Sequence, residues 1–355
     1  MATRNAGVLP AESALARTQH NYKRMNELSK DAVQWLTIGE ESAGQRVDNY
    51  LTRLLKGVPK SHIYRILRSG EVRVNKGRVG PDARLAIGDI VRIPPVRTAV
   101  PAYSADPPPH QVRAGAALPI LYEDDVLIVI DKPSGLAVHG GSGIAAGLIE
   151  QLRAARPQAK FLELVHRLDR DTSGVMLVAK KRAALVDLHA QLRDHAFDKR
   201  YQVLVRGRWR DAMRRVKLGL HKFDTSDGER RVRVDDEGGQ DAETIFRRQA
   251  TWFDREPPLA LLEAELKTGR THQIRVHLTH LGFPLAGDDK YGDFAWNKEL
   301  ARNGLKRMFL HAQTLAFLHP VTRERISFAA PLPPELARFI ARLDAAPTPA
   351  PAPHA

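Results

Sequence analysis

The chain has 355 residues, a length that predicts about two domains, and 43% of them are hydrophobic, which is enough for a sizeable core. It has no cysteine, so disulfides, cysteine zinc sites and thiol nucleophiles are excluded. Lysine and arginine number 55 against 41 acidic residues, and the formal net charge of +14 favours a polyanionic partner, with nucleic acid the first expectation. No apolar run reaches the ~18 residues of a membrane helix, and no secretory signal is expected.

Three segments lack hydrophobic periodicity and divide the chain. Residues 1–35 are polar and are expected to be a disordered N-terminal segment. Residues 98–117 are rich in proline and read as a linker, and residues 344–355 form a Pro/Ala-rich tail. The remaining sequence forms a small module at 38–97 and a large module at 118–343.

The small module predicts two helices and short strands. Apolar residues recur at helical spacing between Val47 and Leu55, and again between Ile63 and Leu67. The expected elements are a helix over 47–55, a helix that Ser61 caps and Gly70 ends, a strand over 72–74, a hairpin turn over 75–77 and a strand over 90–93.

Basic residues gather on the second helix and the hairpin of this module. A solvated charged face would explain them, but their concentration at one corner of a small fold favours phosphate binding. The segment from Gln45 to Val79 resembles the S4-type RNA-binding domain, which implies that this corner contacts RNA. The candidate RNA-binding residues are Lys60, Arg65, Arg68, Arg73, Lys76 and Arg78.

The large module alternates strand and helix patterns irregularly. Expected strands cover 126–131, 175–179, 201–205, 261–266 and 315–318, and expected helices cover about 144–155, 183–193 and 334–343. Because the order is not a regular βαβα series, we expect an α+β fold with a mixed, largely antiparallel sheet flanked by helices.

Several familiar catalytic patterns are absent from the sequence. Neither a P-loop nor a dinucleotide-binding G-x-G-x-x-G after a strand occurs. His272, His277 and His280 suggest a metal hydrolase as one alternative, but no H-E-x-x-H accompanies them and arginines surround them. Packing and capping roles are the preferred interpretation, and no metal or cofactor is predicted.

The segment His166–Gly174, HRLDRDTSG, stands between an apolar run and a strand, so we expect a loop at the mouth of a sheet. Asp171, Thr172 and Ser173 are typical of a charged turn that satisfies local backbone groups. That explanation leaves out Asp169, which two arginines flank. A carboxylate held among guanidiniums suits a nucleophile or a base.

HRLDRDTSG is the signature of the RluA/RluC/RluD family of RNA pseudouridine synthases, and the large module resembles that family throughout. The other matching segments are ILYEDDVLIVIDKPSGLAVHGGSG at 120–143, KRY at 199–201, LKTGRTHQIRVHL at 266–278 and the pairs Gly287-Asp288 and Tyr291-Gly292. The resemblance implies that Asp169 is the essential carboxylate, that Arg275 pairs with it and that Tyr201 packs on the uracil. It also implies that Arg167 fills the space of a flipped-out uridine.

The resemblance implies an isomerase that converts specific uridines to pseudouridine without cofactor or metal. The S4-type module favours 23S ribosomal RNA, naked or in a large-subunit assembly intermediate, as the partner. We expect a cytoplasmic, monomeric enzyme with no membrane contact. Two alternatives remain at this point: the same chemistry on other rRNA or tRNA uridines, and a non-catalytic RNA-binding factor of ribosome assembly.

Overall fold

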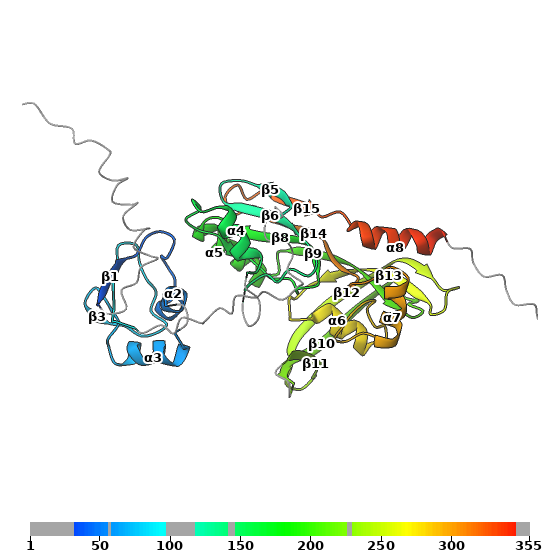
Figure 1. Ribbon diagram of the computed structural model, residues 1–355, viewed down its shortest axis with the longest axis horizontal. Coiled ribbons are helices and arrows are strands. Elements are labelled where there is room, and N and C mark those ends of the chain that lie inside the picture. The colour runs from blue at the N-terminus through cyan, green and yellow to red at the C-terminus, as the bar shows by residue number, and fades with distance from the viewer. Residues whose placement is uncertain (1–31, 56–57, 97–117, 141–145, 226–228, 346–355) are drawn as a thin grey trace, which may run out of the picture. The chain divides into compact units, whose positions relative to one another are not determined.

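The computed structural model describes residues 32–55, 58–96, 118–140, 146–225 and 229–345 (Figure 1). The chain separates into two compact units, Met1–Asp106 and Pro107–Ala355. The proline-rich linker expected at 98–117 lies outside the described residues, as do residues 1–31 and 346–355.

The first unit is a four-stranded antiparallel sheet with two helices on one face. Its strands follow the order β1-β4-β2-β3. The helices bury the residues that their spacing predicted, and these pack with the inner side chains of the sheet in one core. The elements are β1 (Gln34–Thr37), α2 (Val47–Leu54), α3 (Lys60–Arg68), β2 (Arg73–Val74), β3 (Gly77–Arg78) and β4 (Ile90–Ile93).

Two expectations for this unit are wrong in detail. Ser61 does not cap α3, because the extended residue Pro59 occupies that position and the helix begins at Lys60. Residues 34 and 35 are not disordered, since β1 pairs with β4 and turns Leu36 toward the core. The predicted hairpin turn is confirmed: Asn75 and Lys76, with φ of 49° and 68°, connect β2 to β3.

The second unit is built on a large sheet. Its strands are β5 (Ile120–Glu123), β6 (Leu127–Lys132), β7 (Glu163–Leu164), β8 (Ser173–Ala179), β9 (Asp198–Arg206), β10 (Met213–Asp224), β11 (Arg230–Val234), β12 (Gln240–Trp252), β13 (Leu259–Leu266), β14 (Leu310–Leu318) and β15 (Arg325–Ala329). Its helices are α4 (Leu148–Ala155), α5 (Arg182–Arg193), α6 (Gln273–His280), α7 (Phe294–Arg302) and α8 (Pro334–Ala345).

The strand order confirms the predicted fold class. Within the described residues the main path of the sheet is β11-β10-β12-β13-β9-β14-β8-β6-β5, with β15 beside β14 and β7 beside β8. The pairing of β14 with β8 is parallel, and the other neighbours on this path are antiparallel. The fold is therefore α+β with a mixed, largely antiparallel sheet.

Helices cover both faces of this sheet. Tyr201 and Val203 of β9 belong to one core with apolar residues of α4 and α6, so these two helices lie on the face that carries Tyr201. Leu204 of β9 packs with α7 and α8 on the opposite face, where α5 also covers β6 and β8. The site described below lies on the face of α4 and α6.

Two helix boundaries differ from prediction. The helix expected over 144–155 begins only at Leu148, because the carboxylate of Glu150 accepts the backbone N–H of Gly147 and fixes the helix start there. Residues 144 and 145 lie outside the described residues. The last helix runs through Ala345 instead of ending at 343, so the first two residues of the predicted tail are helical.

Candidate active site

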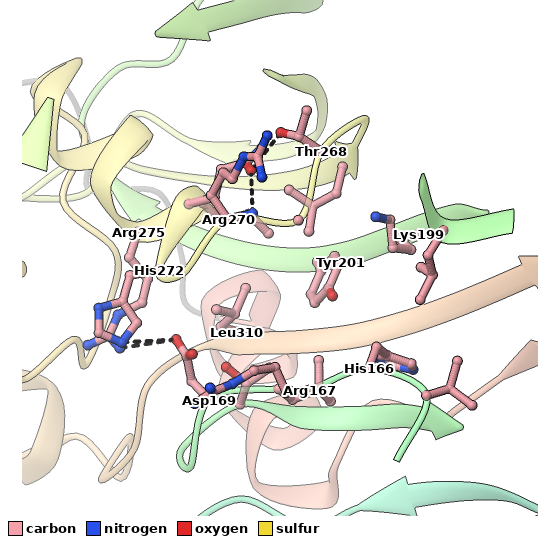
Figure 2. Close-up of a pocket in the computed structure, with 18 of the residues that line it drawn as sticks. His166, Arg167, Asp169, Lys199, Tyr201, Thr268, Arg270, His272, Arg275 and Leu310 are labelled. Atoms are coloured by element: carbon pink, nitrogen blue, oxygen red, sulfur yellow. Dashed lines mark hydrogen bonds and ion pairs between the residues drawn. The ribbon is translucent and has the colours of Figure 1, made fainter. Parts of the chain in front are cut away.

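The four site residues predicted for the large module line one pocket of about 540 Å³ (Figure 2). Arg167 and Asp169 come from the loop between β7 and β8, Tyr201 from β9 and Arg275 from α6. Tyr201 lies centrally in the pocket, with Asp169 and Arg275 on one side. Residues more than 100 positions apart in the chain therefore meet here, as the sequence predicted.

A buried lysine, Lys132, holds the backbone of the loop that carries Asp169. The Lys132 side chain is fully buried at the end of β6, and its Nζ donates hydrogen bonds to the carbonyls of Pro133, Leu136 and Arg170 at 2.7–2.9 Å. Arg170 follows Asp169 directly in the chain, so these hydrogen bonds fix the backbone of the loop that carries Asp169. Burial lowers the pKa of Lys132 to about 7.

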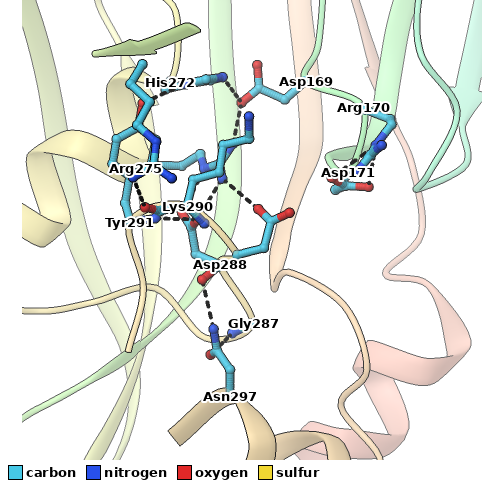
Figure 3. A network of polar contacts seen from close by, with 12 residues as sticks. Asp169, Arg170, Asp171, His272, Arg275, Gly287, Asp288, Lys290, Tyr291 and Asn297 are labelled. Carbon is cyan, nitrogen blue, oxygen red and sulfur yellow. Dashed lines mark hydrogen bonds and ion pairs between the residues drawn. The ribbon is translucent and has the colours of Figure 1, made fainter. Parts of the chain in front are cut away.

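The flanking arginines do not hold Asp169. Arg170 instead pairs with Asp171, at 3.2 Å between Nη2 and Oδ2, and both lie apart from the Asp169 carboxylate (Figure 3). Arg167 lines the pocket with an exposed guanidinium that makes no hydrogen bond or ion pair to any described residue. The cation that meets the Asp169 carboxylate is Arg275, whose Nη1 lies 3.3 Å from Oδ2.

Arg275 is oriented by a second aspartate. Its Nε and Nη2 donate to Oδ2 and Oδ1 of Asp288 at 2.7 and 2.6 Å, and the two side chains are only 4% and 0% exposed. This two-bond geometry fixes the guanidinium plane, so that Nη1 is left to face Asp169. Burial opposes the charge of Arg275, but its hydrogen bonds to Asp288 and the nearby carboxylates raise its pKa above the ordinary value.

Asp288 was not singled out by the sequence, although Gly287-Asp288 belongs to the segments of resemblance. It lies after α6 in a turn, where an aspartate normally satisfies backbone groups. It does so here too, since Oδ1 accepts the N–H groups of Lys290 and Tyr291 at 2.9 and 3.0 Å. Its complete burial beside a buried arginine becomes visible only in the fold (Figure 3).

His272 is a further residue at the site. It precedes α6 with φ of 53°, a left-handed conformation that few residues other than glycine adopt. Its Nδ1 lies 2.8 Å from the Tyr291 hydroxyl, which accepts the Val232 N–H, so the hydroxyl proton is free to bond Nδ1. Nε2 then faces Asp169 Oδ2 at 3.8 Å. Burial lowers the pKa of His272 despite the charge of Asp169, so the ring is neutral at pH 7.

Tyr201 forms the central wall of the pocket. Its neighbours across the sheet are Ala264 on β13 and Ala312 on β14, two small residues that leave the ring uncrowded. Burial, with the charge of Asp169, raises the pKa of Tyr201, so the hydroxyl stays protonated. Lys199, two residues earlier and therefore on the same side of β9, also lines the pocket, and burial lowers its pKa to about 8.

Comparison with known proteins places the chain in a family. The family profile described as RNA pseudouridylate synthase matches residues 126–280, and the S4 domain profile matches residues 45–91. The chain is 50% identical over 323 residues to ribosomal large subunit pseudouridine synthase C of Pasteurella multocida, covering 91% of this chain and 98% of that protein. The chain belongs to the RNA pseudouridylate synthase family. The protein of the same name from Escherichia coli K12 is 52% identical over 314 residues, which cover 88% of this chain and 97% of that protein.

Solved structures of the family share the fold. Human RNA pseudouridylate synthase domain containing 4 superposes with a TM-score of 0.51 at 26% identity, covering 64% of this chain and 93% of that one. This pseudouridylate synthase thus shares its fold with a solved structure of the family.

The six cations predicted for the S4 domain lie on α3 and on the adjoining hairpin. Arg73 donates from Nε to the Gly70 carbonyl at 3.2 Å and from Nη1 to the Lys76 carbonyl at 3.2 Å. Arg78 packs against Gly70, where α3 has ended. The remaining four are exposed: Lys60, Arg65 and Arg68 on α3, and Lys76 in the hairpin turn.

The histidines of α6 do not form a metal site in the structure. His277 is fully buried and neither ring nitrogen has a hydrogen-bond partner among the described residues. Burial lowers its pKa to about 4. The part of the chain that the structure describes contains no group of three or more His, Asp or Glu side chains placed to hold a metal ion. Its helices also lack the combined length and apolarity that a bilayer crossing requires.

Proposed function

We propose that the protein isomerises specific uridines of 23S ribosomal RNA to pseudouridine, with Asp169 as the essential carboxylate. The observation that supports this role most directly is that the Asp169 carboxylate lines a pocket of about 540 Å³ and lies 3.3 Å from a guanidinium that a buried aspartate orients. The enzyme class is that of the family to which the chain belongs.

The reaction exchanges one bond to the sugar for another. The N1–C1′ bond breaks, the uracil turns over, and a C5–C1′ bond forms; a proton leaves C5 and N1 gains one. Asp169 acts either by attacking C1′ to give a covalent sugar ester or by removing the C2′ proton to give a glycal. In both routes the carboxylate must be ionised and fixed, and the Arg275 guanidinium at 3.3 Å serves both needs.

Two further residues complete the proposed chemistry. Tyr201 offers its ring face to the uracil, and its protonated hydroxyl adds no charge beside the detached uracil anion. Arg167 enters the helix space that the flipped uridine leaves, at a cost of roughly a few kcal/mol for unstacking. Its unpaired guanidinium is available to stack and donate there.

We assign the substrate from the relatives and the charge of the chain. Proteins about 50% identical over nine tenths of this chain carry the name ribosomal large subunit pseudouridine synthase C. A net charge of +14 suits an RNA substrate. We therefore propose 23S rRNA or a large-subunit assembly intermediate as the partner, with RNA binding by residues 38–97, chemistry by residues 118–343, and a monomeric enzyme in the cytoplasm.

The test compares two neighbouring aspartates. Asp169→Asn removes the charge that faces Arg275, whereas Asp171→Asn makes the same change two residues later, where the carboxylate pairs with exposed Arg170. Tritium release from 5-³H-uridine-labelled 23S rRNA should be normal in the wild type, close to normal in Asp171→Asn and abolished in Asp169→Asn, while both variants keep RNA binding.

The substrate and the catalytic residue can fail separately in this assay. Turnover by Asp169→Asn would contradict the role of the aspartate. Release from tRNA but not from 23S rRNA by the wild type would contradict the substrate. Tight binding of 23S rRNA without release from rRNA, tRNA or ribosomal precursors would favour a non-catalytic assembly factor.

A further inference from the structure

The outer face of the S4-domain sheet carries an aromatic residue in line with three arginines. The register pairs Trp35 of β1 with Arg92 of β4, Arg92 with Arg73 of β2, and Arg73 with Arg78 of β3. Residues paired in this way point to the same side of a sheet. We call these four residues the Trp–Arg row; at about 4.8 Å between strands it spans roughly 14 Å.

The row lies on the solvent side of the sheet. The next register position joins Leu36, Val91 and Val74, which turn inward to the helices, and Val91 is fully buried. Successive side chains of a strand alternate between faces, so Trp35 and its neighbours point away from this core. Trp35 is 54% exposed, a large aromatic surface left open to solvent.

Backbone carbonyls hold two of the three guanidiniums, and the third packs against the same stretch of chain. Arg92 donates to the Glu71 carbonyl, Arg73 donates to the Gly70 carbonyl, and Arg78 packs against Gly70. Anchoring by neutral carbonyls leaves the positive charges uncompensated.

Nearby carboxylates are committed elsewhere. Glu71 accepts the Ser69 hydroxyl and lies 3.7 Å from Arg65, and Asp89 accepts the Asn75 amide and the Ala86 N–H. The sheet face therefore combines an open indole with three guanidiniums and offers a ligand no acidic residue within the row.

We propose that the Trp–Arg row binds an unpaired segment of the RNA substrate, with a nucleobase stacked on Trp35 and backbone phosphates on the arginines. Single-stranded RNA has both features that the row matches, a π-face for the indole and a charge every nucleotide for the guanidiniums. The inference rests on the proposed function for the identity of the partner. It adds Trp35 and Arg92 to the contacts, and it places Arg73 and Arg78 on the sheet face as well as beside α3.

The experiment measures binding of the full-length protein to a fluorescein-labelled 12-mer of uridine and to a 12-base-pair RNA duplex over a range of salt concentrations. Stacking on an aromatic residue is worth enough that Trp35→Ala should weaken 12-mer binding about fivefold to a hundredfold, with duplex binding much less affected. Ile87→Ala is the matched control, because Ile87 is 66% exposed in the same domain and lies off the row. Trp35→Phe keeps an aromatic face and should restore most of the affinity.

A second pair of variants tests the charges. Arg92→Gln should lower the slope of log affinity against log salt by about 0.7, the value for one phosphate contact on a single strand. Arg84→Gln removes the same charge from an exposed residue off the row and should leave the slope unchanged. Thermal unfolding checks that each variant is folded.

The outcomes separate this inference from the proposed function. Equal 12-mer affinity of Trp35→Ala, Ile87→Ala and the wild type would overturn the inference and leave the row to a protein partner. Absence of pseudouridine formation by the wild type would overturn the proposed function alone, since the binding comparison does not depend on turnover.

Discussion

Replacing Asp288 by asparagine should damage both stability and turnover, because Asp288 is the fully buried partner that orients Arg275. Asparagine keeps the shape but removes the charge, which leaves the Arg275 guanidinium, only 4% exposed, with half of its fork facing a neutral amide. Removing one partner of a buried ion pair costs about 3–5 kcal/mol of unfolding free energy. For a unit the size of residues 107–355, at about 2–4 °C per kcal/mol, the melting temperature should fall by roughly 6–20 °C.

The neighbouring residue supplies the control. Asp289 approaches the same Nη2 atom at 3.3 Å, but its side chain is 59% exposed. Asp289→Asn should therefore cost less than about 1 kcal/mol and leave turnover close to that of the wild type. Calorimetry gives the stability of each variant, and single-turnover tritium release gives the rate at a temperature where all variants are folded.

The two measurements decide what Asp288 does. A slower chemical step in folded Asp288→Asn, with unchanged RNA affinity, would match an Arg275 that no longer holds Asp169. Equal stability and equal rate in the Asp288 and Asp289 variants would refute the reasoning. A loss of stability with a normal rate would show that Arg275 keeps its alignment through Asp169 alone.

Two other predictions follow from the same pocket. Arg275→Lys should lose most activity, because an ammonium cannot reproduce the planar contacts of the guanidinium with Asp288 and Asp169. Single-turnover measurements should show a strongly reduced rate at wild-type affinity for RNA, and a near-normal rate would contradict the prediction. The pKa of Lys132 lies near 7 in the folded protein and near 10.5 in the unfolded chain, so its contribution to stability is present above pH 10.5 and is lost as the pH falls through 7. Denaturant unfolding from pH 7 to 10 should show the wild type gaining stability relative to Lys132→Met, and a constant difference between the two would exclude the burial argument.

Much of the fold could be predicted from local patterns. The apolar spacing from Val47 to Leu55 and the continuous run Val126–Asp131 reflect burial, which local sequence records faithfully. The long strands β10 and β12 were missed, although Val216, Leu218 and Leu220 alternate with polar residues as a half-buried strand requires. This stretch is also rich in arginine and lysine, and its pairing with β12 is what places it in the sheet.

The site was predictable where chemistry concentrates in a short segment, as it does around Asp169. The site was less predictable where the role of a residue depends on contact with a partner that is distant in the sequence. The flanking arginines suggested the cation for Asp169, but Arg170 turns to Asp171. Arg275, 106 residues away, was indicated by the family resemblance and by no local pattern around Asp169. His272 carried no sign of its left-handed backbone, because that conformation follows from the start of α6 and from contact with Tyr291.

The position of β14 has a consequence for when the enzyme becomes active. This strand lies between β9 and β8 in the sheet, yet among the described residues only one strand, β15, follows it in sequence order (Figure 1). Until residues 310–318 pair with β9 and β8, the part of the sheet that carries Tyr201 is not hydrogen-bonded to the part that carries the Asp169 loop. At a synthesis rate of about 5–20 residues per second, roughly 7–30 s separate translation of Asp169 from completion of that strand. A nascent chain that has passed Asp169 therefore has no assembled pocket until translation has also passed residue 318.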